Sequence, residues 1–210
     1  MMARKTATAL ALAIYLLVVA ALAETGRTVS PLDGAIDVEN LPDGVYPVAF
    51  ERSDIAAGAT GIVLGNVHIY TRDRYDDADV DALRVGDTVI VEGEGVEVLT
   101  LRRDAFGVTV NADQDARAFY LVRSEALGGW VVRGMNDLGA YTEQGVAALA
   151  VAEGATFTDA WDIEKEPVTV DYEGIAAALA ATENDSFVPD NTSVRVEGGR
   201  IAQIVRAYMP

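Results

Sequence analysis

The sequence predicts a mainly β protein, either an antiparallel β-barrel or a β-sandwich, and three observations predict it. Short apolar runs from Leu41 onward are separated by Gly, Asp and Asn, residues that favour turns. These turn signals recur roughly every 8–12 residues, a spacing typical of all-β barrels and sandwiches. Polar and apolar residues alternate strictly from Ser193 to Glu197, so one face of that strand is expected to be buried.

The predicted strands combine apolar or β-branched residues with flanking turn residues. In chain order they are Val45–Glu51, Gly61–Thr71, Thr88–Glu92, Val96–Arg102, Gly107–Asn111, Ala118–Arg123, Trp130–Arg133, Val146–Ala152, Thr156–Thr158, Pro167–Tyr172, Thr192–Glu197 and Ile201–Tyr208. Their apolar positions predict a core built from Val48, Phe50, Val89, Val91, Leu99, Leu101, Val194, Val196 and Ile204.

Two pairs of these strands are predicted to form hairpins. The first turns within Val91–Val96, where two glycines permit the positive φ of a tight reversal. The second turns within Val196–Ile201, where a Gly-Gly pair separates two apolar runs. The segment from Ser124 to Gly139 contains four further glycines and is either a glycine-rich hairpin or a crossing between subdomains.

One helix is predicted near residues 172–183. Asp171 precedes this alanine-rich segment and is a suitable N-cap residue. The side chains of Ile175, Ala178, Leu179 and Thr182 recur at helical spacing, so they are expected to form the stripe that faces the core.

The first 23 residues have the pattern of a secretory signal peptide. A basic head, Arg4 and Lys5, precedes an apolar run from Ala7 to Ala23, which ends in small residues before Glu24. The run is shorter than the roughly 20 residues that span a bilayer comfortably, so cleavage is preferred over a retained anchor. The sequence therefore predicts a secreted, extracytoplasmic protein, which would contact the membrane only if this segment were retained.

The remaining chain is divided by composition. Residues 24–40 are polar and predict a flexible leader. Residues 41–125 are expected to form a β-barrel-like subdomain, and 126–210 a β-rich subdomain that contains the helix. One larger β domain is the alternative, because the mature length suits either arrangement.

The charge and the cysteine count exclude several classes of protein. The formal net charge is −17, and loss of Arg4 and Lys5 makes it more negative, so binding to nucleic acid or anionic lipid is disfavoured. Cysteine is absent, so an exported protein of this size must be held together by packing, which favours a bacterial origin. Cysteine nucleophiles and zinc sites of the usual His and Cys sets are excluded as well.

Catalytic residues are difficult to identify in this sequence. His68 is the single histidine, and its place in an apolar run is typical of a strand histidine with a satisfied hydrogen bond. No G-x-S-x-G motif accompanies it. Acidic residues are abundant, so a glycosidase-like carboxylate pair stays open as an alternative.

Calcium is the cofactor that the sequence most nearly supports. Asp77, Asp79 and Asp81 stand at alternate positions, as at the start of an EF-hand loop. The pattern then fails, because Ala82 and Thr88 occupy the positions of the turn glycine and the bidentate glutamate. The competing interpretation is a single helical turn over Ala78–Leu83, capped by Asp77 or Asp79.

Four segments resemble a group of uncharacterised exported bacterial proteins. They are Leu83–Val89, Tyr141–Gly145, Glu183–Phe187 and Val194–Ile201. Proteins of this group are often lipoproteins, and this chain departs from them by lacking the cysteine that carries the lipid. The resemblance implies export and a β architecture, and it implies no activity.

These observations favour an exported, non-catalytic module that binds an extracellular protein or glycan, or that serves a structural role. A carboxylate-based hydrolase and a calcium-binding surface protein are the alternatives. The first would need two carboxylates about 5–10 Å apart in a cleft.

Overall fold

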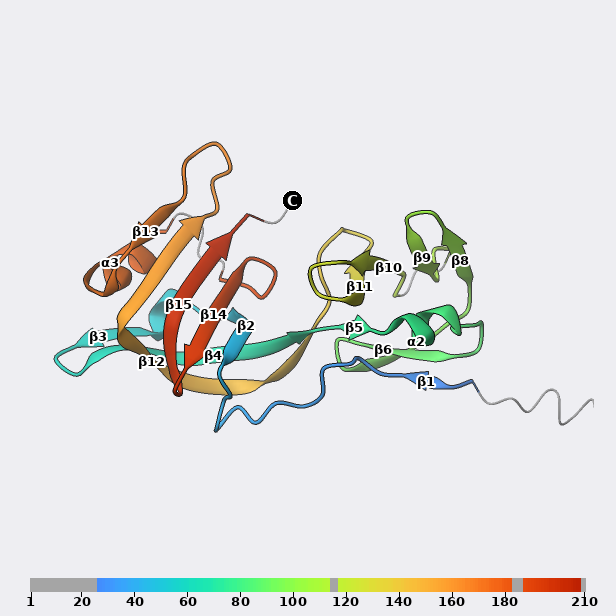
Figure 1. Ribbon diagram of the computed structural model, residues 1–210, viewed down its shortest axis with the longest axis horizontal. Coiled ribbons are helices and arrows are strands. Elements are labelled where there is room, and N and C mark those ends of the chain that lie inside the picture. The colour runs from blue at the N-terminus through green and yellow to red at the C-terminus, as the bar shows by residue number, and fades with distance from the viewer. Residues whose placement is uncertain (1–25, 114–116, 183–186, 209–210) are drawn as a thin grey trace, which may run out of the picture.

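The computed structural model describes residues 26–113, 117–182 and 187–208, and it confirms a mainly β fold (Figure 1). The predicted signal segment 1–23 lies outside the described residues. The strands are β1 (Thr28–Val29), β2 (Gly44–Ala49), β3 (Ile55–Gly58), β4 (Gly61–Arg72), β5 (Arg74–Tyr75), β6 (Thr88–Val91), β7 (Glu94–Glu97), β8 (Leu101–Asp104), β9 (Gly107–Val110), β10 (Phe119–Ser124), β11 (Gly129–Gly134), β12 (Tyr141–Ala160), β13 (Val168–Val170), β14 (Thr192–Glu197) and β15 (Arg200–Ala207). The helices are α2 (Asp77–Asp81) and α3 (Tyr172–Ala181), with a 3₁₀ turn, η1, at Arg52–Asp54.

The first lobe is a closed barrel. Its strands pair in the ring β2–β4–β12–β15–β14 and back to β2, and every pair is antiparallel except β12 with β15. The helix α3 lies in the connection between β12 and β14. This order, with its one parallel pair and its helix in that connection, matches the connectivity of the five-stranded Greek-key barrel known as the OB fold. β3 and β13 extend the sheet at its two ends.

The barrel encloses the larger of two hydrophobic cores. Every ring strand contributes inward side chains, and α3 covers the interior with Ile175 and Leu179. The ring strands supply Tyr46, Val48, Ile62, Leu64, Val67, Ile69, Leu149, Val151, Ala155, Phe157, Val194, Val196, Ile201 and Ile204. The predicted helix is confirmed with Asp171 at its N-cap position, although the Asp171 side chain makes no capping hydrogen bond.

The long strand β12 explains how the ring closes. Its first half pairs with β4 and its second half pairs with β15. Irregularities in register between Glu143 and Gly145 and between Ala147 and Leu149 bend the strand. Sequence patterning predicted two short strands here, Val146–Ala152 and Thr156–Thr158, because the alternation is lost between them, where the register with β15 shifts between Val151 and Thr156.

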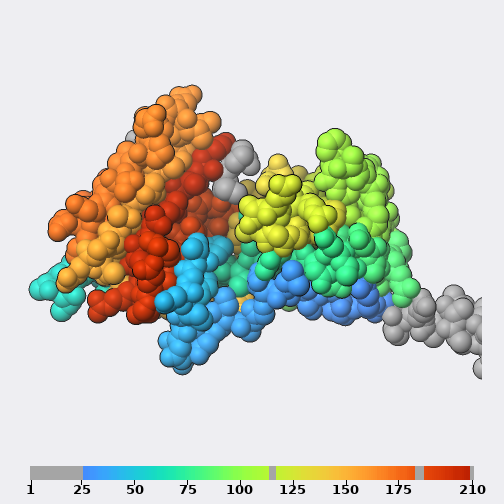
Figure 2. Space-filling view, in the orientation of Figure 1, coloured from blue at the N-terminus to red at the C-terminus, as the bar shows by residue number. Residues whose placement is uncertain are grey.

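The second lobe is formed by residues inserted between β4 and β12, with β1 added from the N-terminal side. A sheet of order β1-β6-β7 and a sheet of order β5-β11-β10-β9-β8 enclose a separate core, which makes this lobe a small sandwich. The two lobes appear as an orange-to-red mass and a green-to-yellow mass (Figure 2). The two lobes are not divided at the expected boundary at residue 125. The chain leaves the barrel after β4 and returns to it at β12, and these two strands pair with each other.

The segment expected to be a flexible leader is packed along both lobes where the structure describes it. Within 26–40, β1 pairs with β6 in parallel and Val29 is buried. The Leu32 N–H donates to the Arg74 carbonyl, and the Ile36 N–H donates to Gln144 Oε1. The segment was expected to be flexible because its composition is polar overall, although a few apolar residues, such as Val29, pack it against the protein.

Most of the predicted core is buried, but Leu99 is not. Both predicted hairpins form, as β6–β7 and β14–β15, and the Ser124–Gly139 segment contains the β10–β11 hairpin. Leu99 lies between β7 and β8 with 48% of its surface exposed, and Leu101 is half-buried. The prediction for Leu99 was wrong because Val96 and Val98 face the core, so alternation places Leu99 on the opposite, exposed face.

Candidate functional site

A cavity of about 620 Å³ lies at one end of the barrel, between β12, β13, β15 and α3. Its walls are largely apolar. They include Phe157, Trp161, Val168, Val170, Ala178 and Tyr208. A cavity of this size and composition is typical of a site that binds a small molecule.

Strand alternation and register place these side chains together. Phe157, Asp159 and Trp161 follow one another at every second position, so they share one face. Asp159 pairs with Val168 on β13 and with Arg206 on β15, which brings a charged pair into the centre of this face. The C-terminal half of α3 lies above it and supplies Ala178, Ala181 and Thr182.

Arg206 is the most unusual residue of the cavity. Its side chain is 1% exposed, and its Nη1 atom lies 3.4 Å from Asp159 Oδ2. The guanidinium carbon lies 4.7 Å from the centre of the Trp161 ring and 5.5 Å from that of Phe187. A planar guanidinium is suited to this position, because it can stack on aromatic faces while it keeps an ionic partner.

Trp161 is held on a second side by Tyr208. Their ring centres are 5.7 Å apart and the rings meet edge to face at 65°. This edge-to-face geometry is favourable for aromatic pairs. Trp161 is therefore fixed at the wall of the cavity by one aromatic and one cationic neighbour.

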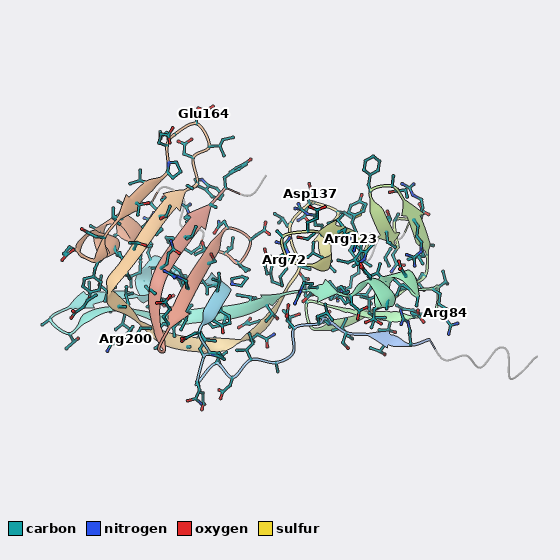
Figure 3. The ribbon with its side chains drawn as sticks, in the orientation of Figure 1. Arg72, Arg84, Arg123, Asp137, Glu164 and Arg200 are labelled. Carbon is teal, nitrogen blue, oxygen red and sulfur yellow. The ribbon has the colours of Figure 1, made fainter. Side chains whose placement is uncertain are left out.

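The mouth of the cavity is acidic. Lys165 Nζ lies 2.7 Å from Asp162 Oδ2, and this bond lowers the pKa of the Asp162 carboxyl. Glu164 stands at the tip of the loop that joins β12 to β13 (Figure 3). Among the described residues, neither Glu164 nor Glu166 has a cationic partner, so the mouth carries uncompensated negative charge.

The three aspartates of the calcium hypothesis are held apart by different partners. Asp77 accepts hydrogen bonds from Trp130 Nε1 at 2.9 Å and from Arg123 Nη2 at 2.7 Å. Asp79 accepts one from Arg27 Nη1 at 3.1 Å. Among the described residues, no side-chain hydrogen bond or ion pair joins Asp81 to Asp77 or Asp79.

The same segment forms the predicted helical turn, with a different cap. Helix α2 begins after Asp76, whose carboxylate accepts the N–H of Asp79 at 2.7 Å, so neither Asp77 nor Asp79 is the N-cap residue. Within 26–113, 117–182 and 187–208, no group of three or more His, Cys, Asp or Glu side chains could hold a metal ion. Sequence reasoning did not anticipate these two arginines, because Arg27 precedes β1 and Arg123 lies on β10, both far from this segment in the chain.

His68 lies on the outer face of the barrel, away from the cavity. Its Nδ1 atom lies 2.8 Å from Glu143 Oε1 on the neighbouring strand, so the expectation of a hydrogen-bonded strand histidine is confirmed. Both side chains are solvent-accessible, beside a shallow hollow that also includes Tyr70.

A buried carboxyl with a raised pKa lies elsewhere. Burial raises the pKa of Asp73, but its oxygens are occupied by the Glu92 N–H and the Thr142 hydroxyl. Asp73 is wholly enclosed between the lobes, so substrate has no access to it. This arrangement is suited to holding strands together rather than to acid–base chemistry.

Sequence reasoning did not identify Arg206, and it favoured a core position for Trp161 over a place in a site. One signal was available, since Arg206 stands two positions after Ile204, where the alternation of β15 places a buried residue. A charged residue at such a position indicates either an ion pair or a site. The identity of its partners depended on the parallel pairing of β12 with β15, which the sequence did not reveal.

Comparison with known proteins adds no further constraint on the site. No family model matches the chain, and neither a curated protein nor a solved structure is similar to it. No helix in the described part of the chain is long and apolar enough to cross a membrane.

Proposed function

We propose that this protein is an exported, non-catalytic binding module whose ligand occupies the cavity around Trp161 and Arg206. The observation that carries the proposal is the apolar cavity built around a buried, ion-paired arginine. Apolar walls with a few fixed polar groups are the usual composition of a binding site. The proposed ligand presents an apolar group, carried by an extracellular protein or a glycan.

The charged groups of the cavity support binding rather than catalysis. Asp159 is committed to Arg206, which in turn is held between two aromatic rings. The pKa of Asp162 is lowered by Lys165, which is the wrong direction for a general acid. Export rests on the N-terminal segment and on the acidic, cysteine-free composition.

A neutral apolar dye tests this proposal without interference from charge. The variant Trp130→Phe leaves Trp161 as the one tryptophan, so its emission reports on the cavity. We expect N-phenyl-1-naphthylamine to bind saturably, with one dye per protein and with energy transfer from Trp161.

A matched pair of variants separates the cavity from the remaining surface. Ala178→Phe fills the cavity and should abolish dye binding, because Ala178 lines its wall. Ala177→Phe, one residue earlier and exposed on the same helix, should leave binding unchanged. Dye binding that is absent in the parent, or equal in the two variants, would contradict the proposal.

A further inference from the structure

We infer that the occupant of this cavity is an extended, basic peptide segment of a partner protein, which adds as a strand to β13 and inserts one apolar side chain. This inference rests on the binding function proposed above. Three observations point to this one class of ligand. They are the free edge of the sheet, the position of that edge beside the cavity, and the negative charge at the mouth of the cavity.

The free edge is that of β13. Within the described residues, β13 pairs with β12 alone and ends the order β13-β12-β15-β14-β2-β4-β3. Val168 on this strand is 61% exposed. An edge strand presents unpaired backbone groups to which an extended peptide can bind by adding a further strand.

The edge and the cavity belong to one surface. Val168 and Val170 line the cavity from β13. A strand that pairs with β13 places every second side chain on the same face as these valines, beside the cavity. One aromatic or large aliphatic side chain of the added strand would therefore reach the apolar wall near Trp161.

The negative charge at the mouth of the cavity favours basic residues beside the inserted side chain of the peptide. The cations Arg206 and Lys165 are paired with Asp159 and Asp162. Glu164 and Glu166 lack cationic partners among the described residues, and the chain as a whole carries a net charge of −17. Lysine or arginine beside the inserted side chain would be attracted, and acidic residues would be repelled.

The length and the flank of β13 restrict such pairing to selected segments. The strand has three residues and follows Pro167, which cannot donate a backbone hydrogen bond. Short edges with an adjacent proline resist indiscriminate aggregation. A partner therefore needs the cavity and the charge in addition to the edge.

Two synthetic peptides of opposite charge provide the test. The basic probe is fluorescein-labelled Lys-Val-Lys-Phe-Lys-Val-Lys, and its counterpart carries Glu in place of each Lys. We expect fluorescence anisotropy to show saturable binding of the basic peptide and at least about tenfold weaker binding of the acidic one. Equal binding of the two would overturn the charge selection.

A matched charge control locates the binding. The double variant Glu164→Lys/Glu166→Lys should weaken binding of the basic peptide by about tenfold or more. Glu97→Lys/Glu125→Lys changes the net charge equally and should have little effect on that binding. Both control residues are exposed on the other lobe. An equal loss in both variants would indicate attraction to the net charge alone.

Backbone methylation tests strand addition directly. A basic peptide with N-methyl groups at alternate residues keeps its side chains and charges but loses the edge hydrogen bonds, so its binding should be lost. Undiminished binding would overturn the pairing with β13.

The neutral dye separates the two proposals. If the dye binds the cavity but the basic peptide binds no better than the acidic one, the peptide inference fails and the binding function stands. If the dye does not bind, the binding function fails, and the peptide inference fails with it.

Discussion

At the scale of single residues, Asp73 connects the two lobes. It lies between β4 and β5, where the chain leaves the barrel, and its N–H donates to the Ala140 carbonyl, where the chain returns. Its carboxylate accepts the Glu92 N–H at 2.5 Å and the Thr142 hydroxyl at 2.6 Å. A fully buried carboxylate with these donors fixes both crossings of the chain against the sandwich.

Removing the Asp73 carboxylate should destabilise the fold. Asp73→Ala leaves two buried donors without an acceptor, which costs about 1–3 kcal/mol in the free energy of unfolding. Asp104→Ala, at an exposed hairpin turn, should change it by less than about 0.5 kcal/mol. Urea unfolding measures both, and a similar small change in the two variants would show that Asp73 is not a structural link.

The raised pKa of Asp73 also predicts a pH dependence. Burial disfavours the charged form, so the folded state retains this proton above 3.8, the pKa of an ordinary aspartate. This contribution to stability is complete below that ordinary pKa and is lost as pH rises through the higher folded pKa. Unfolding curves between about pH 4 and about pH 7 should show this loss in the parent and not in Asp73→Asn. Parallel pH profiles would contradict it.

Asp79 tests the calcium hypothesis at the same scale. Its carboxylate is engaged by Arg27, so Ca²⁺ should raise the melting temperature no more than Mg²⁺ at equal ionic strength. Asp79→Asn should cost less than about 1 kcal/mol, since the ion pair is partly exposed. A larger rise with Ca²⁺ that EDTA reverses and Asp79→Asn removes would restore the calcium site.

At the scale of elements, the alternating sequence of β14 corresponds to a strand with one buried face and one exposed face. Val194 and Val196 are fully buried in the barrel, whereas Arg195 and Glu197 are exposed and lie 2.8 Å apart, Nη1 to Oε1. The strand pairs on both sides, with β15 and with β2, so its register is fixed from two directions. A change of face within this strand therefore affects the whole ring.

Val196→Asp is the corresponding test. An unpaired charge in the barrel interior should lower the free energy of unfolding by about 3 kcal/mol or more. Arg195→Asp, one position earlier on the exposed face, should cost less than about 1 kcal/mol. Chemical denaturation of the two variants provides the comparison, and similar costs would mean that the face of β14 is misassigned.

At the scale of the whole molecule, a small sandwich is inserted into one connection of a closed barrel. The barrel keeps its ring because β4 and β12, which flank the insertion, pair with each other. The N-terminal segment then crosses both lobes and pairs with the sandwich through β1 (Figure 1). The proposed binding cavity lies at the end of the barrel beside α3 and β13, so the insertion leaves it open.

The proposed export of the molecule is tested by its mass. The small residues before Glu24 predict cleavage at that position, because a signal peptidase requires small side chains there. In a secreting bacterial host, the mature protein should therefore have the mass of residues 24–210. Recovery of the protein with Met1 and an intact N-terminal segment would contradict cleavage.

The sequence by itself determined the local features of this protein. The strand and turn pattern, the helix near 172–183, and the two hairpins each depend on neighbours in the chain, and hairpin turns and alternation are local signals. The tertiary structure decided the closure of β12 onto both β4 and β15, the insertion of the second lobe, and the meeting of Asp159, Trp161 and Arg206. These depend on pairing between segments far apart in sequence, where many registers satisfy the same alternation. Only packing of the complete ring selects one of them.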